Sequence, residues 1–169
     1  MNGGSKMLEK VVVTEKELDE LVTVIHEIWP EAFTPIIGQK QVAYMLETYQ
    51  SKKQIGKECA AGVNYFLLKL EGRTIGYTAY EKMGSSIYLS KLYILREVRG
   101  KGLTSEVFHW YEQLAKETEA QEIFLRVNQG NQQAIAVYQH QGFVIEGELI
   151  SDIGEGFQMV DYKMKKRLA

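Results

Sequence analysis

The residues best placed to do chemistry lie in one short segment, residues 99–104, with the sequence Arg-Gly-Lys-Gly-Leu-Thr. Its two glycines leave the backbone uncovered, so that successive N–H groups can approach an anion. The segment is also expected to open a helix, whose first N–H groups lack internal partners and carry the positive end of the helix dipole. The pattern therefore favours a phosphate or pyrophosphate site, to which Arg99 and Lys101 would add charge.

A second interpretation of the same segment needs no ligand, because a tight strand-to-helix turn with solvated basic side chains has the same sequence. Two familiar nucleotide motifs are excluded. No Gly-Lys-Ser/Thr sequence follows at the spacing of a P-loop. No acidic residue follows at the distance that a dinucleotide-binding fold requires. Other residues must therefore identify the ligand.

Hydrophobic periodicity and glycine or proline breakers predict the elements that must position this segment. Thr14 with Glu17 three residues later is a capping-box signal for a first helix, and Pro30 is expected to end that helix. Further helices are expected over about 39–50, in a shorter stretch to Gly62, from the glycine segment to about 119, and over 131–140. Strands are expected over 7–13, 64–70, 73–81, 86–95, 122–128, 143–150 and 157–165.

This order of elements predicts an α/β sandwich in which helices flank a central mixed, mostly antiparallel sheet. The connection over 86–128 is long enough to join a parallel pair of strands through its helix. Residues 1–6 are interpreted as a disordered lead and residues 7–169 as a single domain, since 169 residues leave little room for a second one.

Composition narrows the functional classes. With 20 basic and 22 acidic side chains the net charge is −2, which gives no general attraction to nucleic acid or an anionic membrane. No apolar run approaches the roughly 18–20 residues needed to span a bilayer. The single cysteine, Cys59, excludes an internal disulfide and favours a reducing, cytoplasmic location. No His-x-x-x-His or Cys-x-x-Cys spacing indicates a metal site.

Two sequence blocks carry a family resemblance. Residues 99–104 resemble the Arg/Gln-x-x-Gly-x-Gly/Ala signature of the GNAT superfamily of N-acetyltransferases, although Thr104 stands where glycine or alanine is usual. Residues 131–143 resemble the Asn-x-x-Ala-x-x-x-Tyr-x-x-x-Gly-Phe block of the same family. The resemblance covers roughly residues 60–165, whereas residues 7–60 share only the layout of a strand and two helices.

The resemblance implies a site for acetyl-coenzyme A. In this family the strand before the glycine turn carries a bulge, and its backbone binds the pantetheine arm. The matching residues are Leu92, Tyr93 and Ile94. The amides expected to hold the pyrophosphate are those of Gly100, Lys101, Gly102, Leu103, Thr104 and Ser105. Asn131 matches a side chain that binds the pantetheine arm, and it also fits a helix cap.

The resemblance also implies a mechanism. Tyr138 matches the general acid that protonates the thiolate released when an amine attacks the thioester. Its spacing from Ile135 equally fits a tyrosine packed on the core. The attacking amine must be neutral, so a base must take its proton. Relatives that acetylate protein N-termini place a glutamate for this purpose at the position of Arg126, so the obvious base is missing here. Tyr80 and Glu81 are weaker candidates for the base, and a water chain that relays the proton is the other interpretation.

The acceptor is expected to be a small-molecule primary amine. The layout is loosely similar to bacterial polyamine acetyltransferases, so a polyamine is the first substrate hypothesis. In relatives the early helices and the last loop wall the acceptor pocket, which makes Trp29, Asp152 and Glu155 candidate substrate residues. Relatives commonly form homodimers. An acyl-CoA sensor without turnover is the alternative function, and a purely structural protein would need both blocks to coincide by chance.

Overall fold

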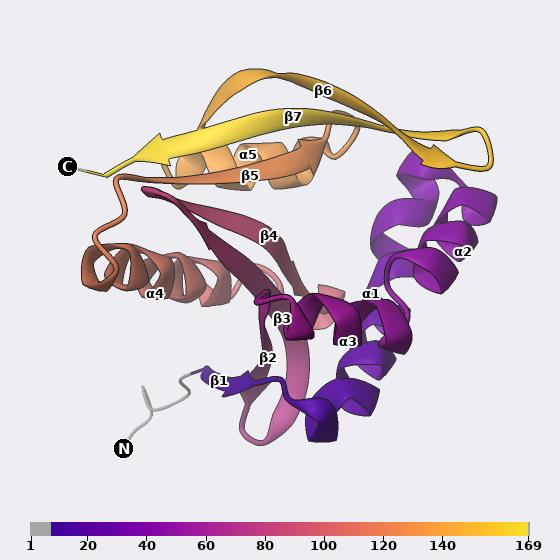
Figure 1. Ribbon diagram of the computed structural model, residues 1–169, viewed down its shortest axis with the longest axis horizontal. Helices are drawn as coiled ribbons and strands as arrows, with labels where there is room; N and C mark the ends of the chain where they lie inside the picture. The colour runs from indigo at the N-terminus through magenta and orange to yellow at the C-terminus, as the bar shows by residue number, and fades with distance from the viewer. Residues whose placement is uncertain (1–7, 169) are drawn as a thin grey trace. The chain divides into compact units, whose positions relative to one another are not determined.

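The computed structural model describes residues 8–168 of the chain (Figure 1). The lead predicted over residues 1–6 lies outside the described residues. The helices are α1 (Leu18–Ile37), α2 (Gln39–Thr48), α3 (Lys52–Ala60), α4 (Leu103–Glu117) and α5 (Gln132–His140). The strands are β1 (Glu9–Val12), β2 (Asn64–Leu70), β3 (Arg73–Met83), β4 (Ser86–Ile94), β5 (Glu122–Asn128), β6 (Val144–Gly154) and β7 (Phe157–Arg167).

The strands form one seven-stranded sheet in the order β1-β2-β3-β4-β5-β7-β6. Antiparallel pairing joins β1 to β2, β2 to β3, β5 to β7 and β6 to β7. Strands β4 and β5 run parallel, with Ser86–Tyr88 opposite Glu122–Phe124. The helix α4 supplies the long connection that a parallel pair requires. The predicted mixed, mostly antiparallel α/β fold is therefore confirmed.

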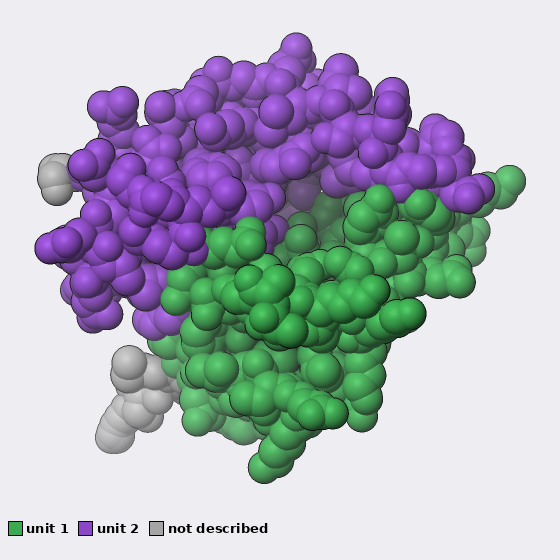
Figure 2. Space-filling model, in the orientation of Figure 1, with its two compact units in different colours: residues 1–81, 91–106 green, residues 82–90, 107–169 purple. Residues whose placement is uncertain are grey.

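The chain divides into two compact units, which Figure 2 distinguishes by colour. Unit 1 comprises the residues up to Glu81 together with Lys91–Glu106. Unit 2 comprises Lys82–Ser90 together with the residues from Val107 onward. Strand β4 and helix α4 each contribute residues to both units. The prediction that residues 7–169 form a single domain stays a prediction.

In unit 1, alternate residues of the paired strands β2 and β3 form the face of the sheet that α1 and α3 cover. Tyr65 lies opposite Ala79 and Leu67 opposite Tyr77, and all four are buried. Tyr65 donates a hydrogen bond to Glu58 of α3 over 2.8 Å. The capping box of Thr14 and Glu17 is present just before α1, as predicted.

The prediction that the first helix ends at Pro30 is wrong, because α1 continues through Pro30 and Pro35 to Ile37. A proline inside a helix removes one backbone hydrogen bond and costs about 3 kcal/mol. Trp29 and Phe33 are 4% and 7% exposed, and burial of a large apolar side chain contributes about 1.5–3 kcal/mol. Packing on both sides of Pro30 therefore offsets its cost.

In unit 2, α4 and α5 cover one face of β5 and β7. Leu125 lies opposite Met164 in the register of these strands, and both are buried. Phe108 of α4 packs against Phe143, which follows α5, with ring centroids 5.5 Å apart. The core of this unit therefore holds α5 at a fixed place over the sheet.

The final hairpin is longer than predicted. Strand β6 was expected to end near residue 150, but it continues to Gly154, and Asp152 pairs with Gln158 across the hairpin. The turn is formed by Glu155 and Gly156, whose φ angles of 54° and 78° suit the tight turn that joins two antiparallel strands. Asp152 therefore lies in a strand, while Glu155 occupies the turn.

Candidate active site

The glycine loop of unit 1 connects β4 to α4. After β4 the chain makes one 3₁₀ turn, Arg96–Val98, and then reaches the glycines. Gly100 and Gly102 have φ angles of 78° and 79°, in the left-handed region that favours glycine. A Cβ built on either glycine would meet no atom within 4 Å. The loop therefore presents uncovered backbone next to open space, as the close approach of an anion requires.

The helix that follows the loop adds the second element of an anion site. The N–H of Glu106 donates to the carbonyl of Gly102 over 3.3 Å, which starts the hydrogen-bond ladder of α4. The N–H groups of Leu103 and Thr104 precede the ladder, and the helix dipole favours negative charge beside them. Leu103 is buried and anchors the helix start, while Lys101 is exposed. This loop and helix start therefore offer the backbone donors that a phosphate or pyrophosphate group requires.

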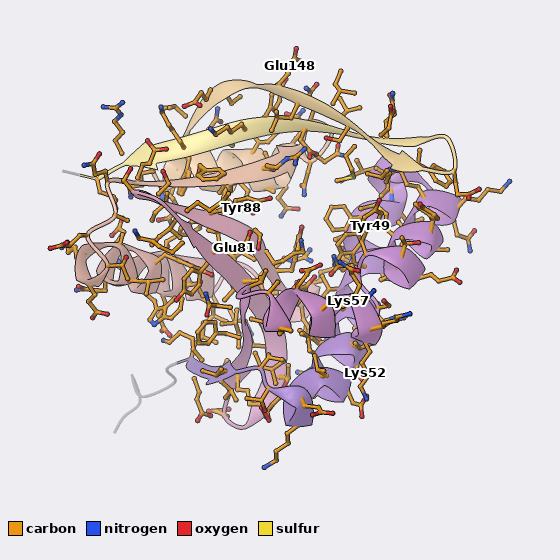
Figure 3. The ribbon with its side chains drawn as sticks, in the orientation of Figure 1. Tyr49, Lys52, Lys57, Glu81, Tyr88 and Glu148 are labelled. Carbon is orange, nitrogen blue, oxygen red and sulfur yellow. The ribbon has the colours of Figure 1, made fainter. Side chains whose placement is uncertain are left out.

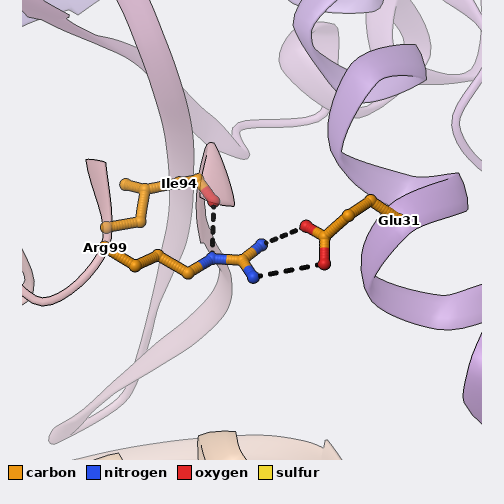
Figure 4. A network of polar contacts seen from close by, with 3 residues as sticks. All are labelled: Glu31, Ile94 and Arg99. Atoms are coloured by element: carbon orange, nitrogen blue, oxygen red, sulfur yellow. Dashed lines mark hydrogen bonds and ion pairs between the residues drawn. The ribbon is translucent and has the colours of Figure 1, made fainter. Parts of the chain in front are cut away.

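Arg99 lies at the start of the loop and contacts α1 (Figure 4). Its guanidinium donates to both carboxylate oxygens of Glu31, over 2.7 and 3.4 Å. Its Nε donates to the carbonyl of Ile94 over 3.1 Å. The positive charge of Arg99, which the sequence suggested for binding an anion, is therefore balanced by the carboxylate of Glu31. Direct phosphate binding by Arg99 stays a prediction.

The strand expected to bind the pantetheine arm lies very close to β3. A Cβ built on Gly76 of β3 would lie 2.3 Å from the carbonyl oxygen of Tyr93 and 2.9 Å from the Cα of Ile94. The hydroxyl of Thr78 donates to the carbonyl of Lys91 over 2.6 Å. Sequence reasoning missed Gly76, although an isolated glycine inside a strand pattern is a known sign of close backbone approach. The bulge implied for β4 stays a prediction.

An aromatic cluster supports this strand from α1. The ring of Tyr93 lies 5.6 Å from Phe33, 6.1 Å from Trp29 and 5.5 Å from Tyr77, measured between ring centroids. The indole N–H of Trp29 donates to the hydroxyl of Tyr77 over 2.7 Å. Trp29, a predicted substrate residue, is thus a buried support for Tyr93. A direct contact between Trp29 and substrate is untested.

In unit 2, Tyr138 is held by two phenylalanines. Its ring centroid lies 6.0 Å from Phe108 and 6.2 Å from Phe143, in edge-on and tilted arrangements. The side chain is partly exposed, but its apolar surroundings desolvate the phenol and raise the pKa of Tyr138 to about 12. The phenol is therefore protonated throughout the physiological range, the form in which an acid can donate. The structure is therefore compatible with both interpretations of Tyr138 that the sequence offered, a tyrosine packed on the core and a proton donor.

Asn131 caps helix α5. Its side-chain oxygen accepts a hydrogen bond from the N–H of Ala134 over 3.2 Å. The capping role that the sequence left open is therefore present. The cap uses only the oxygen, and the amide nitrogen of the same side chain is the group that suits a ligand carbonyl.

The candidates for the base lie at the far end of β3 in unit 1. Tyr80 stacks on Phe66, with planes 8° apart, and burial raises the pKa of its phenol. Glu81 follows it and is partly exposed (Figure 3). In unit 2, Arg126 donates to Ser151 over 3.0 Å and lies 3.5 Å from Asp161. Arg126 is therefore engaged as a cation and cannot serve as a base.

The predicted acidic residues of the last hairpin are exposed. The carboxylate of Asp152 accepts a hydrogen bond from Gln158 over 3.0 Å, and Glu155 lies in the turn. Within residues 8–168, no three or more His, Cys, Asp or Glu side chains are arranged to hold a metal ion. No helix in the described part of the chain is long and apolar enough to cross a membrane.

Comparison with known proteins decides the family. The sequence model of the acetyltransferase (GNAT) family matches residues 22–143, which is more than half of the chain. This chain belongs to that family. This GNAT protein is accordingly an N-acetyltransferase that takes its acyl group from coenzyme A, with acetyl-CoA as co-substrate.

Relatives and solved structures agree with this assignment. An uncharacterised N-acetyltransferase of Lactobacillus delbrueckii is 24% identical over 167 residues, covering 94% of this chain and 96% of the relative. The PaiA N-acetyltransferase of Thermoplasma acidophilum, solved with coenzyme A, has a TM-score of 0.81 at 19% identity, covering 95% and 99% of the two chains. A spermidine N-acetyltransferase chimera derived in part from Vibrio cholerae has a TM-score of 0.70 at 16% identity, covering 95% of both chains. These two structures share the GNAT fold.

Proposed function

We propose that this enzyme transfers the acetyl group of acetyl-CoA to a primary amine of a small molecule, with a polyamine as the first candidate. In this proposal the backbone of Leu92–Ile94 binds the pantetheine arm and the amides of Gly100–Ser105 hold the pyrophosphate. The open space beside Gly100 and Gly102 supports the second role. Asn131 keeps its predicted contact with the pantetheine arm.

Tyr138 is the proposed general acid, and its support is the geometry that fixes its ring beside Phe108 and Phe143, together with a phenol that stays protonated. Acetyl-CoA supplies the acetyl group as a thioester. As the amine nitrogen bonds to the carbonyl carbon and the carbon–sulfur bond breaks, Tyr138 gives its proton to the leaving sulfur. A thiol in water has a pKa of about 8.5, so a phenol with a pKa of about 12 is the weaker acid. Its proton transfer to the sulfur is therefore uphill unless a proton lost by the attacking nitrogen returns to Tyr138 as the thiol forms.

The attacking nitrogen starts as an ammonium group with a pKa near 10 in solution, so it loses one proton before it attacks and a second as the amide forms. The second balances the proton given to the sulfur, and the first needs an acceptor. Arg126 cannot accept it, since its guanidinium stays charged and contacts Asp161. We propose that water relays this proton, with Glu81 and Tyr80 as the side chains to test. The absence of a carboxylate at position 126 also argues against a protein N-terminus as acceptor.

The acidic hairpin supports a cationic acceptor. Asp152 and Glu155 are both exposed and lie three residues apart on β6 and its turn, where their negative charges attract a polycation. A solved spermidine N-acetyltransferase chimera shares the fold at a TM-score of 0.70, which makes the comparison worth testing.

The test is a thiol-release assay with acetyl-CoA and a panel of polyamines, amino acids, aminoglycosides and short peptides, run on wild type and Tyr138→Phe. We expect CoA release that depends on spermidine or a similar amine. We expect Tyr138→Phe to lower turnover about 10²-fold with CoA affinity unchanged. A variant that keeps full turnover would exclude Tyr138 as the acid, and release only with peptides would overturn the small-molecule assignment.

A further inference from the structure

We infer that Glu31 of α1 is a positioning residue for acetyl-CoA, because it holds Arg99 and thereby fixes the entrance of the phosphate-binding loop. The inference rests on the proposed binding role of that loop. Nothing in the sequence indicates it, since the two residues lie 68 positions apart. All the residues that carry it belong to unit 1.

The first step of the argument is the geometry of the ion pair. Both terminal nitrogens of Arg99 donate to the carboxylate of Glu31, and Nε donates to the carbonyl of Ile94, the last residue of β4. A two-pronged guanidinium–carboxylate pair fixes orientation as well as distance. Arg99 therefore connects three parts of unit 1: helix α1, the end of β4 and the loop.

The second step is the flexibility of the loop. Gly100 and Gly102 are the residue type that loses most conformational freedom when it is fixed. One end of this stretch is held by Arg99, and the other begins a helix at Leu103, which is 7% exposed. With both ends held, fewer conformations are lost when the backbone closes on a pyrophosphate, and pre-organisation of this kind raises affinity.

The third step is the rigidity of α1 at Glu31. Trp29 and Phe33, two residues away on either side, are buried against Tyr93 of β4. The helix therefore cannot turn or slide without disturbing the aromatic cluster. One helix thus sets the place of the strand expected to bind pantetheine and of the loop expected to bind phosphate.

The alternative role for this pair predicts the opposite sign. If Arg99 acts by contacting the phosphates of coenzyme A, Glu31 competes for it, and removing the carboxylate should tighten binding. If Glu31 positions the loop through Arg99, removing its charge should weaken binding. The side chains of Arg99 and Glu31 are 29% and 34% exposed, so the effect in either direction should also depend on ionic strength.

The experiment measures CoA affinity by titration calorimetry, with kcat and the KM for acetyl-CoA alongside, for wild type, Glu31→Gln, Arg99→Lys and the double variant. We expect each single variant to weaken binding about five- to tenfold, with kcat at saturating acetyl-CoA within about twofold of wild type. Lysine keeps the charge of Arg99 but cannot make the two-pronged contact. Because Glu31 acts through Arg99, the double variant should bind within about twofold of Glu31→Gln.

Glu97→Gln is the matched control. Glu97 lies in the 3₁₀ turn just before the loop and pairs with Arg73 over 2.8 Å, with both side chains more than half exposed. We expect its effect on CoA affinity to stay below about twofold. Unchanged or tighter binding in Glu31→Gln, when wild type binds CoA, overturns the inference. Absence of CoA binding in wild type instead overturns the proposed function. If Glu31→Gln proves unfolded by circular dichroism, Glu31→Asp, which keeps the charge but shortens the reach to Arg99, decides by the same criterion.

Discussion

Replacement of Gly76 by alanine is the perturbation whose size the structure defines best. The added Cβ would lie 2.3 Å from the carbonyl oxygen of Tyr93, whereas ordinary contacts begin at 3.4 Å, so β4 must retreat by about 1.1 Å. The obstacle is backbone, which cannot swing aside as a long side chain does. Overpacking of this kind costs about 1–3 kcal/mol, and we expect the upper end of that range.

Two measurements follow from that displacement. A loss of about 3 kcal/mol in a chain of this length should lower Tm by about 6–12 °C. A shift of about 1 Å in the strand proposed to bind the pantetheine arm can cost about 10²-fold in kcat/KM for acetyl-CoA. Differential scanning calorimetry and the thiol-release assay therefore test one movement of Tyr93 in two independent ways.

Gly56→Ala is the matched control. In the interior of α3 a Cβ at this position would meet only the Cδ1 of Leu18 at 3.9 Å, an ordinary contact. Alanine in a helix interior is more stable than glycine by about 0.5–1 kcal/mol, so Tm should rise by about 1–4 °C with kinetics unchanged. If Gly76→Ala kept the wild-type Tm and KM, the close approach of the two strands would be refuted.

Three further predictions test other parts of the site. Because burial raises the pKa of Tyr138 to about 12 and the acid donates only when protonated, kcat should show no falling limb below about pH 11. Trp29→Phe removes the donor to the buried Tyr77 hydroxyl and should lower unfolding free energy by about 1–3 kcal/mol in urea titrations. Asp152→Asn with Glu155→Gln should raise the KM for spermidine by about fivefold to thirtyfold, since each charge contributes up to about 1 kcal/mol at close range in water.

Controls for these predictions come from the chain itself. Glu148→Gln removes an exposed carboxylate of the same strand as Asp152 (Figure 3), and it accepts from Gln129 over 2.9 Å much as Asp152 accepts from Gln158. The KM of this variant for spermidine should match that of wild type, and an equal rise in KM in all the variants would indicate a general charge effect.

For the pH prediction, a falling limb of kcat near pH 8–9 that vanishes in Tyr138→Phe would contradict the argument that Tyr138 stays protonated.

Most of the fold was predictable because it depends on local patterns. Alternating apolar residues and glycine turns placed the strands at 64–70 and 122–128 as observed. The failures arose where packing outweighs local preference. Pro30 breaks an isolated helix, but the burial of Trp29 and Phe33 continues α1 through it. Asp152 disfavours a strand, yet pairing with Gln158 extends β6.

The residues of the candidate site also differ in whether local sequence marks them. Arg99, Gly102 and Tyr138 could be named as candidates from the sequence because they belong to contiguous sequence blocks. Glu31 was not, since nothing local marks a glutamate that meets an arginine 68 residues later. Gly76 lies between these cases, because its sequence context signals a close approach but not which strand approaches.

The division into units has a consequence for modular evolution and engineering. Residues 91–106, which contain the predicted pantetheine strand and the glycine loop, belong to unit 1, yet unit 2 precedes them at Ser90 and follows them at Val107. Neither unit is therefore one uninterrupted stretch of sequence. The unit boundaries fall within β3, β4 and α4, so exchange of either unit with a relative would need three crossovers, each of them inside a strand or a helix.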